Sequence, residues 1–426
     1  MMLFLLEKVA GTLIKKNKPI VICITGSVGK TSVKNAISYT LDEVYDVRST
    51  PKNINNEFGV PISVIGNYNF KEGFFALLRM LLIGLKQLIL HKFPKILVIE
   101  VGAGKIGEVE RISKWLKPNI LMVTNLPNKP SHLGVFGSRE NILKEKKFLA
   151  DVMDKEGIMF IDDSELGMDS FIENFKGKVE RYNSQEFISK SNYSVIYDVE
   201  NEMSKPVGIE FLINIYNNQH KLIFFGFIGK QNIKAILLAK TVGERFNLES
   251  NSIILGLEKY KPEPGRLNVL QGKKNNVTII DDSFNSSPVA VENGLETLLS
   301  LSVNNRQRKI AVLGDMLNFG NDSDNIHKNT AIKYIQQIDI LITVGDKSKN
   351  WQSFSNNKLR LNMHFRNATE SAEYIRKIWE EGDIFYFKGG YLIRLEKAVK
   401  ILSKCSEKDL VRQEKYWQKP KYELFN

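Results

Sequence analysis

The sequence predicts an α/β protein built from two mostly parallel β-sheets whose strands are joined by crossover helices. Short runs of β-branched and apolar residues are mostly separated by helical patterns, which is the order expected of parallel strands. Between about residues 190 and 228 the pattern changes to short alternating strands, which predict a small antiparallel meander. The predicted parallel strands are residues 20–24, 96–100, 120–124, 157–161, 277–281, 309–313, 339–344 and 384–388.

The domain organisation follows from chain length and one proline-rich stretch. A chain of 426 residues is too long for one ordinary core. The stretch 261–265, Lys-Pro-Glu-Pro-Gly, is the best candidate for an interdomain hinge. We therefore expect an N-terminal helix over 1–17, a central domain over 18–263 that carries the meander, and a Rossmann-like C-terminal domain over 264–426.

Composition and charge limit the classes of partner. The hydrophobic content of 43% and the charged content of 25% are those of a soluble globular protein. The net charge of +12 favours polyanionic ligands such as nucleotides and nucleotide-sugars, or an acidic membrane surface. The lysines are dispersed and no DNA- or RNA-binding motif is present, so we expect no nucleic-acid partner. Two cysteines without a pairing pattern, and no evident secretory signal, predict a cytoplasmic protein.

The most informative segment is Thr25-Gly26-Ser27-Val28-Gly29-Lys30-Thr31, directly after the first predicted strand. Its glycines let the backbone approach phosphate oxygens, its lysine supplies a charge for the β/γ-phosphates, and its threonine offers an oxygen to Mg²⁺. A helix opening here adds backbone N–H groups. Residue 24 is Ile rather than Gly, so the loop is shorter than the usual phosphate-loop pattern and indicates a subclass. The segment predicts an ATP-binding, P-loop-type central domain, with contacts from Gly26, Ser27, Gly29, Lys30, Thr31 and Ser32.

Polar residues follow several predicted strands at the edge where parallel sheets bind ligands. Glu100 follows the strand 96–100 and suits a Mg²⁺ ligand facing the phosphate loop, although it could instead cap the helix that follows. His132 lies in a loop, and both a functional and a structural imidazole remain open. The other polar strand ends are Thr124-Asn125, Asp281-Asp282, Gly314-Asp315 and Lys388-Gly389.

Residues 74–90 form a strongly apolar helical segment with two charges, Arg79 and Lys86, on one face. The segment is short for a membrane span and carries charge. Two interpretations stay open. The helix packs on the core or on the N-terminal helix, or the region 74–92 makes a peripheral contact with a membrane, helped by His91 and Lys92.

Taken in order, these motifs resemble the Mur ligase family, and most closely its MurF branch. The resemblance spans about residues 18–400. It implies that an N-terminal uridine-nucleotide-binding domain is absent, because only about 18 residues precede the first strand, and that 74–92 is an insertion. The matching positions are 25–31, 53–61, 100–103, 124–125, His132, 136–138, Lys146, Gly229, Asn232, 265–266, 281–285, 314–316, His327 and 388–389.

The resemblance implies a reaction and a set of metal ligands. Mur ligases use ATP to phosphorylate a carboxylate, and an amine then displaces phosphate from the acyl phosphate. By motif, Lys30 and Thr31 would hold the phosphates and a first Mg²⁺, Glu100 would help to bind it, and His132 would bind or adjoin a second Mg²⁺. Lys146 matches the lysine that the family carbamylates, which turns a cation into an anionic metal ligand. Without the family, Lys146 would be a solvated helix lysine.

The remaining site residues carry over in the same way. Asn232 matches the residue that reads adenine, Arg266 and Asp282 match contacts to γ-phosphate or ribose, and Lys388 matches an acyl-phosphate or substrate contact. The substrate loop would contain Asn55, Asn56 and Glu57, although a structural turn is an alternative, with Asn285 as a further substrate residue. Gln231, Phe148 and Gly390-Tyr391 depart from the family pattern, so the acceptor side is altered while the ATP side is intact.

The resemblance therefore implies a monomeric, cytoplasmic enzyme of peptidoglycan synthesis. It would join the dipeptide D-Ala-D-Ala to the nucleotide-sugar peptide UDP-MurNAc-tripeptide, using ATP, Mg²⁺ and a carbamylated lysine. Two alternatives stay open. One is a sister ligase, of folylpolyglutamate-synthase or pseudomurein type, that acts on another carboxylate and amine. The other is a membrane-docked, non-enzymatic ATP-binding module.

Overall fold

The computed structural model describes residues 1–52, 54–66, 74–90, 92–127, 130, 132–165, 167–200, 202–304, 306–354 and 361–419. Among the residues of the predicted motifs, helices and meander, Asn53, His91 and Asn201 lie outside these ranges. The chain divides into two compact units. The first comprises Met1–Lys190, Asn214–Gln219 and Ile233–Lys261, and the second comprises Ser191–Ile213, His220–Asn232 and Pro262–Asn426. Most of the meander, which we expected in the central domain, therefore groups with the second unit.

The first unit is built on a parallel sheet in the order β2-β3-β1-β4-β5-β6. Four of its strands were predicted and are confirmed. The two that were missed lie at the sheet edges, are only partly buried, and contain charged residues that hide the apolar pattern of a strand. The strands are β1 Ile20–Thr25, β2 Val47–Ser49, β3 Ile96–Glu100, β4 Ile120–Val123, β5 Ile158–Asp162 and β6 Lys178–Tyr182.

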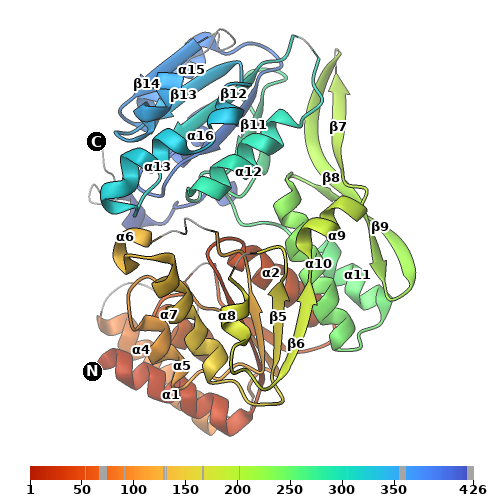
Figure 1. Ribbon diagram of the computed structural model, residues 1–426, viewed down its shortest axis with the longest axis vertical. Helices are drawn as coiled ribbons and strands as arrows, with labels where there is room; N and C mark the ends of the chain where they lie inside the picture. Colours follow the sequence, from red (N-terminus) through yellow and green to blue (C-terminus); the bar gives the residue numbers. More distant parts are fainter. Residues whose placement is uncertain are drawn as a thin grey trace. The chain divides into compact units, whose positions relative to one another are not determined.

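Helices cover both faces of this sheet. Successive strand residues point to opposite faces, so Val21 and Cys23 pack with one helix layer while Ile22 and Ile24 face the other. Helices α2, α10 and α11 lie across the sheet from α5 and α7 (Figure 1). The helices are α1 Met2–Asn17, α2 Lys30–Asp42, α3 Gly59–Ile65, α4 Phe74–Ile89, α5 Glu108–Ser113, α6 Leu133–Phe136, α7 Arg139–Asp151, α8 Asp169–Ile172, α9 Ser184–Lys190, α10 Lys230–Arg245 and α11 Ser250–Glu258.

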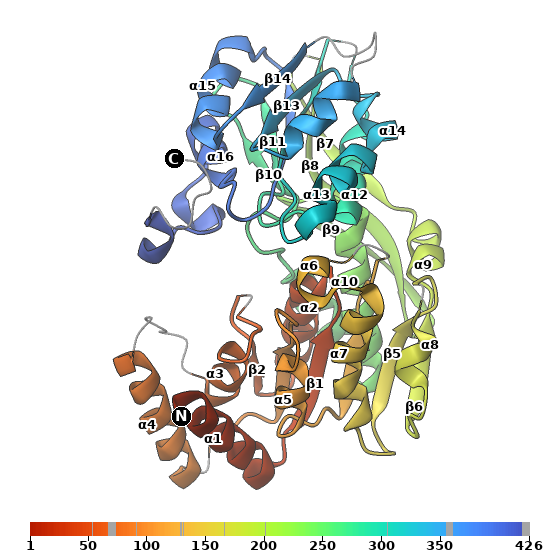
Figure 2. The same cartoon turned by 60° about the vertical axis from the view of Figure 1, so that its left-hand side comes forward.

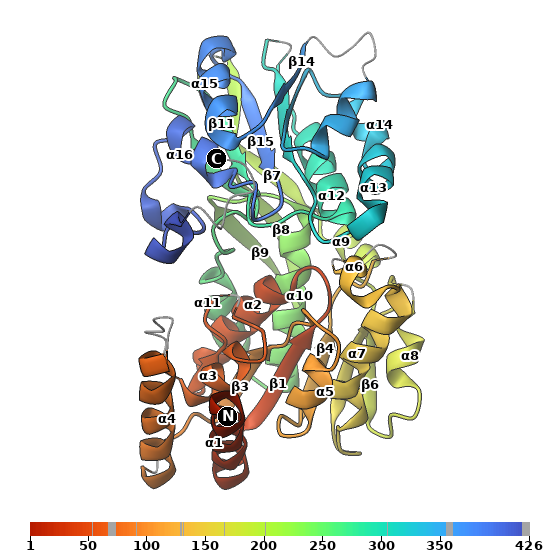
Figure 3. The ribbon, with the colours of Figure 1, turned by 90° about the vertical axis from the view of Figure 1, so that its left-hand side faces the viewer.

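The predicted helices at 1–17 and 74–90 are confirmed as α1 and α4, which run side by side (Figures 2 and 3). A Cβ on Gly84 would lie 2.5 Å from Val9 Cγ1, so the glycine lets the two helices approach closely. Met80 joins a small core with α1 and α3 residues. Burial of one face of α4 is thus confirmed, while its opposite face remains exposed.

The second unit contains a mixed sheet in the order β10-β11-β15-β12-β13-β14, in which β10 is antiparallel to β11 and the other pairs are parallel. All four strands predicted here are confirmed. The missed strands, β10 and β14, lie at the edges and are only partly buried. The strands are β10 Asn268–Gln271, β11 Thr278–Asp281, β12 Lys309–Gly314, β13 Ile340–Val344, β14 Leu361–Phe365 and β15 Ile384–Lys388.

Helices again cover both faces of the second sheet. Figure 3 shows α15 and α16 on one side, and α12, α13 and α14 on the other. The apolar residues of α15 and α16 form a continuous core with the central strands. The helices are α12 Pro288–Leu299, η1 Gly320–Asp322, α13 Ser323–Asn329, α14 Ile332–Ile335, η2 Ser348–Phe354, α15 Ala368–Ile378, α16 Glu396–Leu402, η3 Glu407–Asp409 and η4 Lys415–Gln418.

The predicted meander is confirmed as a separate three-stranded sheet in the order β7-β8-β9. Its strands are β7 Ser194–Glu200, β8 Met203–Ile215 and β9 Asn218–Phe225. We expected this meander to attach to the first sheet. The meander instead forms a sheet of its own, and beyond the end of β9 Phe227 bridges to Asn268 at the start of β10.

Gly256 provides a test of the packing behind the phosphate loop. A Cβ at Gly256 of α11 would lie 2.4 Å from Thr40 Cα, so α11 sits directly on the backbone of α2. We expect Gly256→Ala to lower the free energy of unfolding by about 1–3 kcal/mol, because α11 must move away from α2. Urea titration measures the change, with the exposed neighbour Leu255→Ala as the control. A Gly256→Ala variant as stable as the wild type would contradict this packing.

Candidate active site

The phosphate loop lies between β1 and α2, at the carboxyl end of a central strand. Gly26 has a φ of 136°, and a Cβ there would lie 2.0 Å from Thr124 Oγ1, so only glycine fits this close approach. Gly29, with a φ of 87°, precedes the first turn of α2. The Lys30 ammonium donates to the carbonyls of Gly26 (3.0 Å) and Ser27 (3.2 Å). The carbonyl groups of the loop therefore surround the Lys30 ammonium. Thr31 and Ser32 follow in the first turn of α2.

Two residues beyond β4 hold this loop in place. Ser27 N donates to Asn125 O at 2.8 Å, and Thr124 Oγ1 donates to Thr25 O at 3.0 Å. The Asn125 side chain in turn donates to Glu165 Oε1 at 2.5 Å. Thr124 and Asn125, predicted as polar residues at a strand end, thus act by positioning the phosphate loop.

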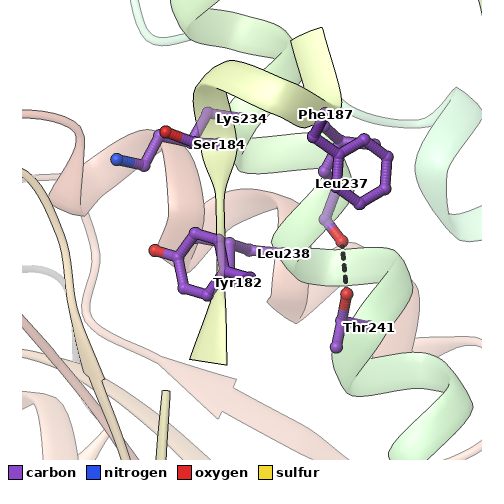
Figure 4. A pocket seen from close by; sticks show the side chains of 7 residues that line it. All are labelled: Tyr182, Ser184, Phe187, Lys234, Leu237, Leu238 and Thr241. Carbon is purple, nitrogen blue, oxygen red and sulfur yellow. Dashed lines mark hydrogen bonds between the residues drawn. The ribbon is translucent and has the colours of Figure 1, made fainter. Parts of the chain in front are cut away.

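A small pocket lies close to this support (Figure 4). Lys234 of α10 forms ion pairs with Asp162 and Glu165, and its ammonium extends to the same side as the Tyr182 hydroxyl. The rest of the lining is mostly apolar. None of the predicted nucleotide-binding residues lines this pocket, so it is separate from the predicted ATP site. Its lining is Tyr182, Ser184, Phe187, Lys234, Leu237, Leu238 and Thr241.

Glu100 lies at the end of β3, paired in register with Ile24 of β1. Its side chain is 1% exposed. Oε1 accepts a hydrogen bond from Asn55 Nδ2 at 2.6 Å, while Oε2 is buried and has no hydrogen-bond partner among the described residues. A buried carboxylate oxygen without a donor is strongly destabilising unless a cation or another donor satisfies it.

The predicted substrate loop has mixed roles. Asn55 orients Glu100, and the close approach of its backbone to Gly102 (Gly102 N to Asn55 O, 2.8 Å) fixes it there. Asn56 Oδ1 accepts from Gly59 N at 2.8 Å, which is the structural turn that the sequence left open. Glu57 accepts from Lys105 Nζ at 2.6 Å. Substrate contact by these three residues stays a prediction.

Lys146 is a buried lysine on α7 and not a solvated one. Burial, together with the nearby charge of Lys30, lowers its pKa from 10.5 to about 7. The carboxylates of Glu108, Glu145 and Glu100 act against this shift. At neutral pH a substantial fraction of Lys146 is therefore an uncharged amine, which is a nucleophile.

The buried acids Glu108 and Glu145 were not predicted from the sequence. Glu145 accepts from Gly107 N (2.9 Å) and Val109 N (2.7 Å), and Glu108 accepts from Glu57 N (2.8 Å) and Gly104 N (2.7 Å). Glu108 lies on α5 and Glu145 on α7. Acidic residues are common on helices, so neither residue gave a signal in the sequence. Only the Glu-Lys pair at 145–146 sits at a position that a motif marked.

His132 is the residue directly before α6, at its N-cap, and has a left-handed backbone (φ 70°). Burial and the charges of Lys30 and Lys146 lower its pKa to about 4. The imidazole is therefore neutral at physiological pH and has a free lone pair for a metal or a proton. The electrostatic coupling between these three side chains shows that the fold brings together residues from three separate motifs.

These residues fit Mg²⁺. The fit rests on two oxygen donors, the orphaned Glu100 Oε2 and the hydroxyl of Thr31. The neutral His132 adds a nitrogen donor, which Mg²⁺ prefers less than oxygen. Among the described residues, no cluster of three His, Cys, Asp or Glu side chains could hold a metal ion. A site that takes ligands from a threonine, a modified lysine and the nucleotide phosphates needs no such cluster.

In the second unit, Asp282 and Lys388 form a buried ion pair at the carboxyl ends of β11 and β15. Lys388 Nζ lies 2.7 Å from Asp282 Oδ2 and 2.9 Å from Asn285 O, and Tyr386 OH donates to Asp282 at 3.1 Å. Burial raises the pKa of Asp282 and lowers the pKa of Lys388, and their mutual attraction opposes both shifts. Asn285 takes part through its backbone carbonyl.

Arg266 and Asn232 lie in the same unit. The Arg266 guanidinium stacks 4.1 Å above the Phe284 ring, and its Nε is buried without a hydrogen-bond partner among the described residues. Asn232 is 2% exposed in the first turn of α10, and its Nδ2 donates to Ile228 O at 3.0 Å. Arg266 thus retains a donor for an anion, while part of the Asn232 amide is used within the protein.

His327, which belongs to the motif series, has a structural role. Its Nε2 accepts from Met316 N at 2.8 Å, so its Nδ1 carries the proton and donates to Ser323 O at 2.7 Å. Asp315 accepts from three backbone N–H groups, those of residues 346, 347 and 348. Both residues hold the loop after β12 in place.

A buried network behind the loop that follows β11 was not predicted. Arg412 donates to Ser283 O (2.6 Å) and Phe284 O (2.8 Å), and to Glu396 Oε2 (2.8 Å). Arg394 donates to the other oxygen of Glu396 at 2.5 Å. These contacts connect the C-terminal segment to the residues next to Asp282. Single charged residues distant in sequence carry no local signal of such a network.

The lowered pKa of Lys146 predicts a pH-dependent stability. The unfolded chain keeps the proton up to about 10.5 and the folded chain loses it near 7, so unfolding takes up a proton between these values and stability rises with pH. In buffers purged of carbon dioxide, Lys146→Met should remove this slope, which is at most about 1.4 kcal/mol per pH unit. Urea titrations at several pH values measure it, with the exposed Lys144→Met as the control. A constant difference between wild type and Lys146→Met would contradict the prediction.

Comparison with known proteins gives two family matches. The Mur ligase middle domain matches residues 24–243, and the Mur ligase glutamate ligase domain matches residues 265–391. The boundary between them falls close to the proline-rich stretch. Arg394, Glu396 and Arg412 lie beyond the second match.

Individual relatives are distant in sequence. The UDP-N-acetylmuramoyl-tripeptide–D-alanyl-D-alanine ligase of Bacillus subtilis (strain 168) is 24% identical over 388 residues, which cover 90% of this chain and 75% of that protein. The enzyme of the same name from Buchnera aphidicola subsp. Acyrthosiphon pisum (strain APS) is 28% identical over 410 residues, covering 95% and 81%. The solved MurF ligase of Thermotoga maritima in complex with ADP has a TM-score of 0.72 and 20% identity, covering 94% and 83%.

The matched domains span most of the described residues and include the phosphate loop, Glu100, His132, Lys146, Asn232, Arg266, Asp282 and Lys388. The chain belongs to the Mur ligase family.

Proposed function

We propose that this protein is an ATP-dependent amide ligase that joins D-Ala-D-Ala to a UDP-MurNAc-tripeptide in peptidoglycan synthesis. The observation that carries the proposal is the cluster around the phosphate loop. There the buried Glu100 has an unpartnered oxygen, and Lys146 has a pKa of about 7. The curated relatives that the chain matches bear the name of this ligase, which supports the choice of substrates.

The residues of the phosphate loop would bind ATP and orient its γ-phosphate. Backbone N–H groups at the start of α2 and the Lys30 ammonium would replace water around the phosphates, and Lys30 would leave its two loop carbonyls to do so. Phosphoryl transfer to a carboxylate depends mainly on position and on charge neutralisation. The family reaction then proceeds by attack of an amine on the acyl phosphate, with release of phosphate.

Thr31, Glu100, His132 and a carbamylated Lys146 would hold Mg²⁺, with two ions expected. When bound, Mg²⁺ neutralises charge on the transferring phosphoryl group. The protein prepares these ligands. Burial keeps His132 uncharged, and Asn55 fixes one oxygen of Glu100 so that the other is available.

Carbamylation of Lys146 follows from its own chemistry. The neutral amine adds to the carbon of CO₂ and releases a proton, which leaves an anionic carboxylate on the nitrogen. Only the uncharged amine can react, and the low pKa of Lys146 supplies it at neutral pH. The modification also replaces a buried cation with an anion beside Lys30, which changes repulsion into attraction.

In the second unit, Arg266 and Lys388 would bind anionic groups of nucleotide or acyl phosphate, and Asp282 would hold Lys388 in position. Asn232 would read adenine, and Asn55, Asn56, Glu57 and Asn285 would contact the substrates. We further propose that the enzyme is a cytoplasmic monomer that meets a membrane, through residues 74–92, only peripherally.

A substrate assay tests the reaction. With ATP, Mg²⁺, UDP-MurNAc-tripeptide and D-Ala-D-Ala, the purified protein should release phosphate and form the pentapeptide product, identified by mass spectrometry. Omission of either peptide substrate should abolish product formation. Product from another acid and amine pair, with none from this pair, would instead support a sister ligase. Absence of any ATP-dependent ligation would support a non-enzymatic module.

Lys146 variants test the carbamate. We expect Lys146→Ala to lower kcat about a hundredfold or more, because an anionic ligand is lost from the phosphoryl-transfer site. Lys146→Arg should not restore activity, since guanidinium cannot form a carbamate. The exposed Lys144→Ala on the same helix is the control.

Carbamylation also has a readout that does not depend on activity. Incubation with ¹³C-labelled bicarbonate should give one carbamate signal by NMR in the wild type that is missing in Lys146→Ala. Full activity in Lys146→Ala, or a labelled signal that persists in it, would disprove the role of Lys146.

A further inference from the structure

Helix α4 has an apolar face whose side chains are largely exposed in the described part of the structure. Phe75 is 83% exposed, Leu82 59% and Ile89 78%, and these positions are seven residues apart. Leu78 and Leu85 are also exposed and lie on the same side. At about 100° per residue, the five side chains form one continuous row. We call this row, Phe75, Leu78, Leu82, Leu85 and Ile89, the α4 stripe.

The α4 stripe is held outward by the packing of the opposite face. Gly84 contacts Val9 of α1, and Met80 belongs to the core that α1 and α3 share. Gln87, the one uncharged polar residue of the helix, turns its amide inward and donates to Ile65 O at 2.6 Å. Rotation of α4 to bury the stripe would expose an equally apolar face. The stripe therefore stays on the surface of the folded unit.

The charged side chains exposed on α1 and α4 have the same sign. Arg79 and Lys86 are exposed along one edge of the stripe. On α1, Lys8, Lys15 and Lys16 are exposed, while the acidic residue of that helix, Glu7, is buried and paired with Arg111 at 2.9 Å. Among the described residues of α1 and α4, every exposed charge is positive.

We propose that the α4 stripe docks this protein on the surface of a lipid bilayer that contains anionic lipids. A row of aliphatic and phenyl side chains edged by cations fits a helix that lies in the membrane interface, with its apolar face below the headgroups. From Phe75 to Ile89 the row is about 21 Å long, enough to lie along the surface. The described helices provide no bilayer-crossing segment, so the contact is peripheral.

The charges argue against a second copy of this chain as the occupant. A two-fold interface places the same patch against itself, so Arg79 and Lys86 at the edge of the stripe would meet the same apolar and cationic patch on the partner. No exposed acid on these described helices could offset them. Phosphate headgroups supply the missing negative charge. A protein partner is less well matched, because the stripe lacks the Trp and Tyr anchors typical of such interfaces.

Vesicle flotation of the full-length protein tests the proposal. The protein should bind phosphatidylcholine vesicles that contain phosphatidylglycerol and bind pure phosphatidylcholine much more weakly, with affinity falling as salt rises. Leu82→Gln with Ile89→Gln should reduce partitioning about tenfold or more. Arg79→Gln with Lys86→Gln should reduce it roughly tenfold at low salt.

Matched controls separate the stripe from the general basicity of the chain. Leu255→Gln with Val199→Gln changes two exposed apolar residues elsewhere, and Arg376→Gln with Lys377→Gln removes the same charge from α15. Both controls should stay within about twofold of wild type. Circular dichroism and urea titration confirm that each variant is folded.

Three results would overturn the proposal. The first is no binding to anionic vesicles at low salt. The second is an equal loss of binding in a control and in its matched stripe variant. The third is a dimer in light scattering, without vesicles, that Leu82→Gln with Ile89→Gln dissociates, because a second copy would then cover the stripe.

Discussion

The rest of the first unit depends on the burial of opposite charges at the carboxyl ends of β1 and β3. Glu100 and Lys146 are buried and Lys30 is half-buried, and Lys146 interacts electrostatically with both of the others. Removing such charges from water is costly unless each is compensated. Lys30 bonds to its own loop carbonyls, and Glu100 has Asn55 for one oxygen. Lys146 differs from both, because burial lowers its pKa to about 7, so that the neutral amine is populated beside the charged form at neutral pH. The fold thus keeps a reactive amine and an unsatisfied carboxylate where a nucleotide would supply the missing partners.

In the second unit, the buried charged side chains next to the strand ends form ion pairs with one another. The opposite charges of Asp282 and Lys388 compensate each other. Tyr386 donates a further hydrogen bond to Asp282, and the Asn285 carbonyl accepts one from Lys388. Behind them, Glu396 is held between Arg394 and Arg412, and Arg412 extends the network to the backbone next to Asp282. Buried charges that are paired with one another are held in defined positions. Such a network suits residues that orient a ligand, and the C-terminal segment contributes to it although it lies outside the matched domains.

Helix α4 has one apolar face that packs inside the protein and a second apolar face that is exposed. A helix that is apolar nearly all round is normally buried. Here Gly84 allows close contact with α1 on one face, while the opposite face stays exposed beside cations. Packing of this helix inside the protein and contact with a membrane were alternatives in the sequence. In the structure they are compatible, because they concern different faces of the same helix.

Local pattern alone determined much of this protein. The buried strands, the phosphate loop, the helices at 2–17 and 74–89 and the strand-end positions of Glu100, Asp282 and Lys388 all follow from short-range periodicity and glycine placement. It failed for edge strands such as β2 and β14, which are only partly buried, so that the apolar signal is weak. The burial of Lys146 and the hydrogen bonds of Asn56 and His327 were decided only by tertiary structure. Burial, the neighbours that shift a pKa and the atom that receives each hydrogen bond depend on residues distant in the chain, and no local pattern encodes them.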